Sequence, residues 1–359
     1  MIETLPLPPG LRLARYRIAL APEGRLVLRA NPGAMLRGAL GWALKHGVCG
    51  RPAGEPCGQK CELPDICPYA FLWESPTPPD AEVLRASQEV PPPYLLEPPL
   101  TPPTVIEPGG LVTFGLALFG NAIRYFPYLL AACRSMGQAG LGQARVRCRL
   151  AVGNFLHPDG EETSLFDPAT QRMVGSQPAA PTVDDWAPVP PSQVDQVTLR
   201  FLTPTRLKIG SGLERKGHFI EDPPPFHVLI RALLRRVSSL SYFYGGQRWE
   251  LDYRGWIARA EAVQINQADV RWVDWERYST RQERAMNLGG IMGEVTYTAE
   301  ERRSGGAEEQ GNGPMHQSTN LPATNVPSLG AFLPLLRLGE LVHVGKAAVF
   351  GNGRFEVTR

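Results

Sequence analysis

The chain has 359 residues, of which 43% are hydrophobic, and a formal net charge of +2 at neutral pH. This length exceeds that of a usual single domain, so two domains are expected. Charged residues, prolines and glycines interrupt every apolar stretch before the ~18 residues that a membrane helix needs, which excludes a membrane-spanning class. Residues 1–10 have neither a basic start nor an apolar run, so we expect no signal peptide there and a soluble, cytoplasmic protein.

The first half begins with a strand pattern. Residues 11–20 nearly alternate apolar and basic side chains, as in a strand with one face on a core, and residues 25–28 form a short strand after a turn. Apolar residues recur at helical spacing after Pro32, so a helix is predicted over residues 34–46. The dense prolines of residues 75–108 predict an extended loop with rigid turns rather than a packed element.

A strand–helix–strand pattern completes the first half. A strand is predicted over residues 110–119, a helix over residues 125–136 and, after a glycine-rich turn, a strand over residues 144–150. Residues 153–193 are polar and rich in proline, which predicts a hairpin extension followed by a linker.

The second half repeats this order. The predicted elements are a strand over 196–202, an amphipathic helix over 226–244, strand-rich segments over 249–276 and 288–299, a helix or compact turn over 329–341, and a strand over 354–357. Residues 305–325 have almost no large apolar side chains, which predicts a mobile loop. Two βαββαβ-like units, each closing on a glycine-rich loop, predict an α+β chain of tandem ferredoxin-like (RRM-like) domains over residues 1–193 and 194–359.

Four of the six cysteines lie close together: Cys49, Cys57, Cys61 and Cys67. In a cytosolic protein, clustered cysteines favour a metal site over disulfides, and four thiolates this close can complete a tetrahedral zinc site. The spacing lacks the paired Cys-x-x-Cys of the strongest zinc signatures, and an iron–sulfur cluster also takes four cysteines. We favour structural zinc in a Cys-rich insertion, about residues 49–67; four free thiols in a loop are the alternative. Cys133 and Cys148 are expected to be ordinary buried thiols.

Basic side chains are concentrated between residues 201 and 236, a segment with only three acidic residues. The seven basic residues are Arg206, Lys208, Arg215, Lys216, Arg231, Arg235 and Arg236. A nucleic-acid-binding protein shows such a patch rather than a basic total, although a solvated loop and helix face explain the same residues. Seven aromatic residues of this half could stack on bases as in RRM sheets, but most are expected in the core or in helix packing, and none is assigned to RNA: Tyr242, Phe243, Tyr244, Trp249, Trp256, Trp272 and Trp275.

Three segments resemble the CRISPR-associated repeat-processing endoribonucleases of the RAMP superfamily, in the branch whose N-terminal domain carries a cysteine cluster. They are LRGALGWAL at residues 36–44 with the cysteine segment ending at Cys67, FLTPTRLK at residues 201–208, and LGELVHVGK at residues 338–346 with FGNGRF at residues 350–355. They follow the family's order across nearly the whole chain. The resemblance implies two tandem RRM-like domains, metal-independent cleavage of precursor CRISPR RNA within its repeats, and repeat RNA and other CRISPR effector subunits as partners.

Metal-free RNA cleavage uses the 2′-hydroxyl as the nucleophile and needs a base, an acid and positive charge for the phosphorane. Histidine performs acid and base work near neutral pH, and the resemblance favours His46, at the end of the first helix. Lys45 is the nearby cation. His46 could instead cap the helix, or bind a metal with Cys49, three residues away. His343, beside the glycine-rich loop, is the second candidate, with a buried structural role as its alternative.

The loop Gly351-Asn352-Gly353 lets backbone N–H groups approach a phosphate with no Cβ in the way, and the resemblance places this loop at the RNA-facing surface. A tight turn is the alternative. The family's loop has an additional early glycine, where this chain has His343. The RNA contacts that we expect are Arg37, Arg206, Lys208, Arg215, Lys216, His218, Arg231, Arg235, Lys346, Gly351, Asn352, Gly353 and Arg354.

Two other functions remain open. One is a catalytically inactive RNA-binding subunit of a CRISPR effector complex on the same fold. The other is an enzyme with catalytic zinc in the cysteine segment, which is disfavoured because catalytic zinc keeps an open position and usually has histidine or carboxylate ligands. No cofactor is expected for catalysis.

Overall fold

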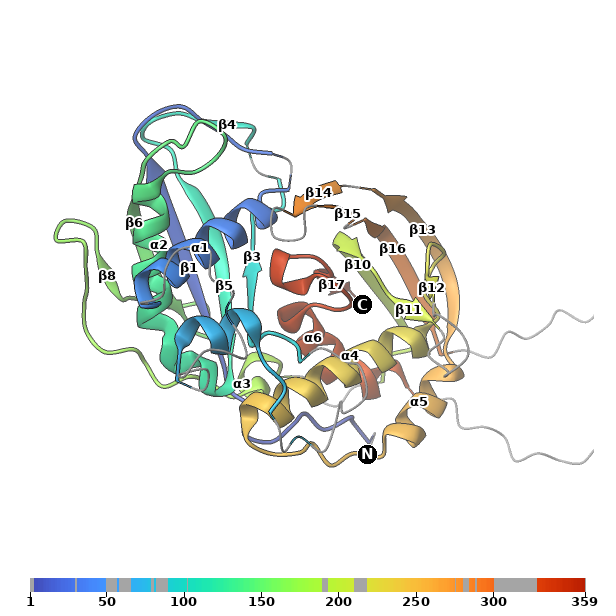
Figure 1. Ribbon diagram of the computed structural model, residues 1–359. Coiled ribbons are helices and arrows are strands. Elements are labelled where there is room, and N and C mark those ends of the chain that lie inside the picture. The colour runs from blue at the N-terminus through green and yellow to red at the C-terminus, as the bar shows by residue number, and fades with distance from the viewer. Residues whose placement is uncertain are drawn as a thin grey trace, which may run out of the picture.

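The computed structural model describes residues 3–29, 31–49, 57, 66–78, 81, 90–101, 103–188, 193–209, 218–274, 276–279, 284–287, 289–299 and 328–358. Figure 1 shows two sheets with helices packed on them, one from the first half of the chain and one from the second. None of the described helices is long and apolar enough to cross a membrane.

The first half forms a sheet with the strand order β3-β5-β1-β6-β7, in which every neighbouring pair is antiparallel. Two helices that contact each other, α1 and α2, connect β1 to β3 and β5 to β6. The bounds are β1 (Leu13–Pro22), α1 (Gly33–Val48), β3 (Tyr94–Glu97), β5 (Val112–Phe119), α2 (Phe126–Ala139), β6 (Cys148–Leu156) and β7 (Glu162–Ser164).

The second half repeats this topology in the sheet β13-β16-β10-β17. In both halves the first strand lies in the middle, between the third and the fourth, and the second strand lies at the edge. The tandem ferredoxin-like fold predicted from the sequence is therefore confirmed. The bounds are β10 (Gln196–Thr205), α4 (Phe226–Leu240), β13 (Gln264–Val273), β16 (Gly290–Thr298), α6 (Leu333–Val342) and β17 (Phe355–Thr358).

Short elements decorate this frame. The strands are β2 (Leu26–Val27), β4 (Val105–Ile106), β8 (Phe166–Asp167), β9 (Arg172–Met173), β11 (Lys208–Ile209), β12 (His218–Phe219), β14 (Glu276–Ser279) and β15 (Arg284–Asn287). The helical turns are η1 (Ala70–Glu74), η2 (Gly120–Tyr125), α3 (Val183–Trp186), η3 (Ser241–Gly245), α5 (Tyr253–Glu261), η4 (Leu329–Phe332) and η5 (Ala348–Phe350).

Strand β3 corrects the prediction of an unpacked loop over residues 75–108. All four residues of β3 are buried, and they pair with β5 from Tyr94↔Leu118 to Glu97↔Gly115. Prolines flank the strand without breaking it, because β3 lies at the edge of its sheet and proline is tolerated at edges and strand ends.

Helix α5 corrects part of the prediction of a strand-rich segment over residues 249–276, in which β13 is the strand. The side chain of Asp252 caps it by accepting a hydrogen bond from the backbone N–H of Gly255, at 2.9 Å. Trp256 and Ala260, four positions apart, are both buried. Strand β6 also differs from the prediction: it begins at Cys148 rather than residue 144, because Leu141 and Val146 pair across a turn first.

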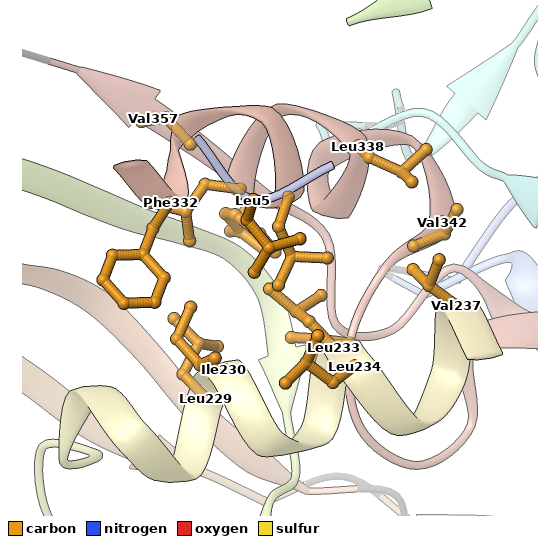
Figure 2. Packing of buried hydrophobic residues seen from close by; sticks show 14 of the residues in the cluster. Leu5, Leu229, Ile230, Leu233, Leu234, Val237, Phe332, Leu338, Val342 and Val357 are labelled. Carbon is orange, nitrogen blue, oxygen red and sulfur yellow. The ribbon is translucent and has the colours of Figure 1, made fainter. Parts of the chain in front are cut away.

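The N-terminal segment packs into the core of the second half. Leu5, Leu7 and Leu11 belong to the same buried cluster as α4 and α6, and the backbone N–H of Leu5 donates to the carbonyl of Ala331 at 2.8 Å. Figure 2 shows Leu5 among the side chains of Leu233, Leu234 and Phe332. Full burial of one leucine stabilises a fold by ~1.5–3 kcal/mol, so these contacts hold the two halves together. The domain boundary at residues 193–194 stays a prediction.

Candidate functional site

Helix α1 presents its last turn to solvent, and His46 lies there. The ring of His46 is exposed, its centroid lies 4.2 Å from that of Trp42, and its Nδ1 lies 2.8 Å from the carbonyl oxygen of Trp42. Because a carbonyl can only accept, we assign the proton of the neutral ring to Nδ1. Nε2 of His46 is then left as a basic nitrogen that faces away from the helix carbonyl.

Lys45 lies beside His46 in sequence but occupies another side of the helix. Its Nζ is 5.7 Å from the ring centroid of Tyr69, the residue just before η1. Consecutive helical residues are about 100° apart around the axis, which separates the two side chains. The end of α1 therefore carries an exposed imidazole, a cation and the exposed indole of Trp42.

The cysteine cluster is only partly described. Cys49 follows α1 and Cys67 precedes η1, and both are partly exposed, as is Cys57. Cys61 lies outside the described residues. Among the described residues no group of three His, Cys, Asp or Glu is placed to hold a metal ion, so the metal site and the Cys-rich insertion stay predictions.

His343 occupies a different place, at the boundary between the two halves. It is fully buried and follows α6 with φ 57°, a left-handed backbone conformation that favours glycine. This is the position where the resembled family has its early glycine. Nδ1 of His343 lies 3.1 Å from the carbonyl oxygen of Asn352, and Nε2 lies 4.0 Å from Oε1 of Glu97 in β3. Glu97 in turn accepts two hydrogen bonds from Nη2 of Arg15, at 3.0 and 2.8 Å.

Burial and charge set the protonation of this pair. Burial lowers the pKa of His343 to about 3; Glu97 opposes the shift, and Arg236 and Arg354 reinforce it. Burial acts to raise the pKa of Glu97, but Arg15, then His343 and Arg354, more than offset this and hold that pKa below its ordinary value. At neutral pH a neutral imidazole therefore lies beside an ionised carboxylate, out of reach of a macromolecular substrate.

The glycine-rich loop packs inward. Gly351, Asn352 and Gly353 are all buried. Gly351 has φ 91°, and a Cβ on it would collide with the side chain of Pro98; a Cβ on Gly353 would collide with the carbonyl of Val344. These glycines thus let the loop approach β3 closely, as a tight turn requires. Their contact with RNA stays a prediction.

Arg37 connects this loop to the start of α1. Its guanidinium lies 4.9 Å from the ring centroid of Phe350 and 5.5 Å from that of Trp73. His46 is nine residues further along the same helix, or about 13 Å at 1.5 Å per residue. The structure thus brings Arg37 to the loop and keeps His46 at the far end of α1.

The remaining basic residues fall into two groups. Arg206, Lys208 and His218 gather at the β11–β12 hairpin, and the backbone N–H of Lys346 donates to the carbonyl of Arg206 at 3.1 Å. Arg231 and Arg235 are exposed on α4, and Arg231 lies 3.8 Å from Glu261.

Two further basic residues, Arg354 and Arg236, are less available. Arg354 is half-buried, and its backbone N–H donates to the hydroxyl of Thr203 at 2.9 Å. Arg236 donates to the carbonyl of Val342, and burial lowers the pKa of Arg236 to about 10. Arg215 and Lys216 lie outside the described residues.

Sequence reasoning missed two features. It did not single out Arg15 and Glu97, whose pairing depends on the register of separate strands. It also did not find a pocket of about 560 Å³ between the β11–β12 hairpin and the end of β13, in which Phe219 and Trp272 flank Arg206. The basic and aromatic residues that end these strands are the only sequence signal for it.

Comparison with protein families identifies a known domain in the second half of this chain. Residues 199–355 match the model of the CRISPR-associated endoribonuclease Cas6. The second half of the chain is a Cas6 domain. The resemblance of the sequence segments to CRISPR repeat-processing endoribonucleases is thereby confirmed, and it rests on the Cas6 match of residues 199–355. Residues 11–178 match a model described as an N-terminal domain, and comparison with curated proteins gives no match.

Solved Cas6 structures share this fold at low sequence identity. A Cas6 product complex has a TM-score of 0.53 at 15% identity, covering 97% of this chain and 99% of that one. Thermus thermophilus Cas6 gives 0.51 at 15% identity, with the same coverage. A partial Cas6-RT-Cas1--Cas2 complex gives 0.54 at 14% identity and covers 98% of this chain, which spans 47% of that longer chain.

Proposed function

We propose that this Cas6-type chain binds CRISPR repeat RNA and cleaves precursor CRISPR RNA without a metal ion. The exposed imidazole of His46 carries the proposal, because its Nδ1–H is held by the Trp42 carbonyl and its Nε2 is left as a base. The Cas6 domain over residues 199–355 supports RNA as the substrate.

The chemistry needs one proton removed and one returned. Nε2 of His46 takes the proton of the 2′-hydroxyl, whose oxygen attacks the adjacent phosphorus and forms a phosphorane. The bond to the 5′ oxygen then breaks, and the imidazolium supplies the proton that this oxygen needs. The products are a 2′,3′-cyclic phosphate and a 5′-hydroxyl, and the positive charge of Lys45 stabilises the phosphorane.

His343 fits this role poorly. A general acid or base must reach the reacting oxygen within about 3 Å or through one water. His343 is fully buried, and burial holds its pKa at about 3. We therefore assign His343 to the contact between the two halves and keep His46 as the catalytic residue.

Cleavage of a repeat transcript in EDTA tests the proposal. We expect products with 5′-hydroxyl and 2′,3′-cyclic phosphate ends, and an uncut but bound substrate when the cut site carries a 2′-deoxyribose. Cleavage of the 2′-deoxy substrate, or a strict requirement for a divalent cation, contradicts the mechanism.

A second function is an RNA-binding subunit that does not cut. The fold likeness to a Cas6-RT-Cas1--Cas2 complex favours other CRISPR proteins as partners of such a subunit. This function replaces the first if the pure chain binds repeat transcript but leaves it whole in every buffer.

Zinc is proposed as a structural ion of the cysteine cluster. Thiolates suit zinc, and Cys49 and Cys67 lie at the two ends of the segment, next to α1 and η1. Such an ion would order the segment next to His46 without taking part in cleavage.

A further inference from the structure

The pocket beside the β11–β12 hairpin has the size of a small-ligand site, whose range is ~300–1,000 Å³. Its volume is about 560 Å³, and it is lined by Arg206, His218, Phe219, Glu221, Trp272 and Asp274. The aromatic residues come from β12 and from β13, the edge strand of the second sheet.

The aromatic walls are held in place. The guanidinium of Arg206 lies 4.5 Å from the ring centroid of Phe219 and 5.7 Å from that of Trp272, so it bridges the two rings. The indole N–H of Trp272 donates to Asp274 at 2.7 Å, which fixes the orientation of that ring. Phe219 keeps 36% of its surface exposed. Aromatic faces held in this way are stacking surfaces for the bases of single-stranded RNA.

The charges of the pocket select the kind of ligand. Two carboxylates, Glu221 and Asp274, line it together with one guanidinium, that of Arg206. This balance disfavours a phosphate inside and favours a planar group that presents N–H donors. A metal ion is also disfavoured, because no cluster of three His, Cys, Asp or Glu ligands occurs in the part of the chain that the structure describes.

Positive charge lies at the rim instead. Lys208 is exposed and pairs in register with Phe219 across the β11–β12 hairpin. Lys346 is also exposed, and its backbone N–H holds the carbonyl of Arg206. A nucleotide whose base enters the pocket would thus have two lysines near its phosphates.

We propose that this pocket binds one unpaired guanine of the RNA. Because the Arg206 guanidinium already lies over both rings, the base stacks on the exposed surface of Phe219, and its adjacent N1–H and N2–H groups donate to the two oxygens of the Glu221 carboxylate. Guanine fits because no other common base presents two adjacent donors on that edge. The proposal deepens the proposed function by naming a base-specific contact of the RNA substrate.

The affinity of short RNAs tests the pocket alone, because these RNAs contain no repeat at which they could be cut. Hexauridylate with one central guanine should bind the wild-type chain about 10-fold more tightly than hexauridylate, and inosine, which lacks the N2 amino group, should fall between them. Phe219→Ala should weaken binding of the guanine RNA by about 10-fold. Glu221→Gln should lower the preference for guanine by about 5-fold and leave the affinity for hexauridylate unchanged. Glu250→Gln, an exposed carboxylate outside the pocket, is the matched control.

Equal affinity for the two RNAs, or a Phe219→Ala variant that binds as wild type does, overturns the pocket. Cleavage of a repeat transcript by the same proteins separates this result from the proposed function. A wild-type chain that prefers guanine but leaves the transcript whole supports guanine binding in the pocket and rejects the proposed nuclease activity. A wild-type chain that cuts the transcript without preferring guanine supports the proposed nuclease activity and rejects guanine binding in the pocket.

Discussion

Nε2 of His343 lies 4.0 Å from Oε1 of Glu97, across the boundary between the two halves. Neither residue has much freedom: His343 is fully buried with a left-handed backbone, and Glu97 is held by two hydrogen bonds from Arg15. The pair therefore makes the fit of the two halves sensitive to protonation.

Acid should destabilise the fold through this pair. The pKa of His343 is about 3 in the folded chain and 6.5 ordinarily, so on acidification His343 is protonated in the unfolded chain before it is protonated in the folded chain. The free energy of unfolding therefore falls as the pH drops below about 6.5. His343 alone should cost about 2 kcal/mol between pH 7 and pH 5. The lowered pKa of Glu97 acts in the same direction, but only below its ordinary 4.5.

Urea unfolding at pH 7 and pH 5 measures this effect. His343→Asn should lose most of the difference between the two pH values, because asparagine does not titrate. An unchanged difference in this variant would show that other groups cause the acid sensitivity.

Loss of Glu97 should be costly at neutral pH. Glu97→Ala leaves the partly buried guanidinium of Arg15 without its carboxylate, and breaking a buried ion pair in this way costs ~3–5 kcal/mol. Thermal unfolding checks this, with Glu162→Ala as the control, because its partner Arg17 is half exposed. Equal losses in the two variants would contradict a special role for Glu97.

His46→Ala should lower the single-turnover cleavage rate by ~10²-fold or more with a nearly unchanged Kd for RNA, because a neutral imidazole neutralises no phosphate. His157→Ala, whose ring lies 2.9 Å from the hydroxyl of Thr163 in the first half, is the matched control. Wild-type cleavage by His46→Ala would reject the assignment. A loss of metal and thermal stability together would instead make His46 a zinc ligand.

Lys208→Ala and Lys346→Ala should show the opposite pattern. Each should weaken RNA binding and reduce the salt slope of log Kd by about one, because one phosphate contact releases about one counterion. The cleavage rate at saturating protein should stay at the wild-type value. Affinity titrations at several salt concentrations measure both quantities, and an unchanged slope would place these lysines away from RNA.

Metal analysis of the purified chain should find about one zinc per chain, lost in Cys61→Ser. Cys133→Ala is the control: Cys133 is buried in α2, where burial raises the pKa of its thiol to about 12, so it should lose some stability but keep the metal. Iron with visible absorbance, or no metal at all, would contradict structural zinc.

Local patterns in the sequence predicted most of the frame. Helices α1, α2 and α4 follow from apolar periodicity, and Tyr244, Trp249 and Trp256 are buried as expected. Strand β3 was missed because the prolines that flank it disfavour sheet, and only its place at an edge makes them harmless. Helix α5 was missed because nine residues show too few turns for a clear period.

The candidate site was likewise predictable from the sequence only in part. The exposure of His46 follows from its place at a helix end. The burial of His343 does not, because it depends on Glu97 and Asn352, which only the meeting of the two halves brings close.

The N-terminal leucines have a consequence for synthesis. Leu5 and Leu7 are synthesised long before the residues of α4 and α6 among which they pack. In each nascent chain these leucines must therefore stay unpacked until the second half has been translated, and forming a contact between residues so distant in sequence is slow. The second half expressed alone should lack the part of its core that Leu5, Leu7 and Leu11 supply, so this fragment should aggregate unless it is made together with the first half.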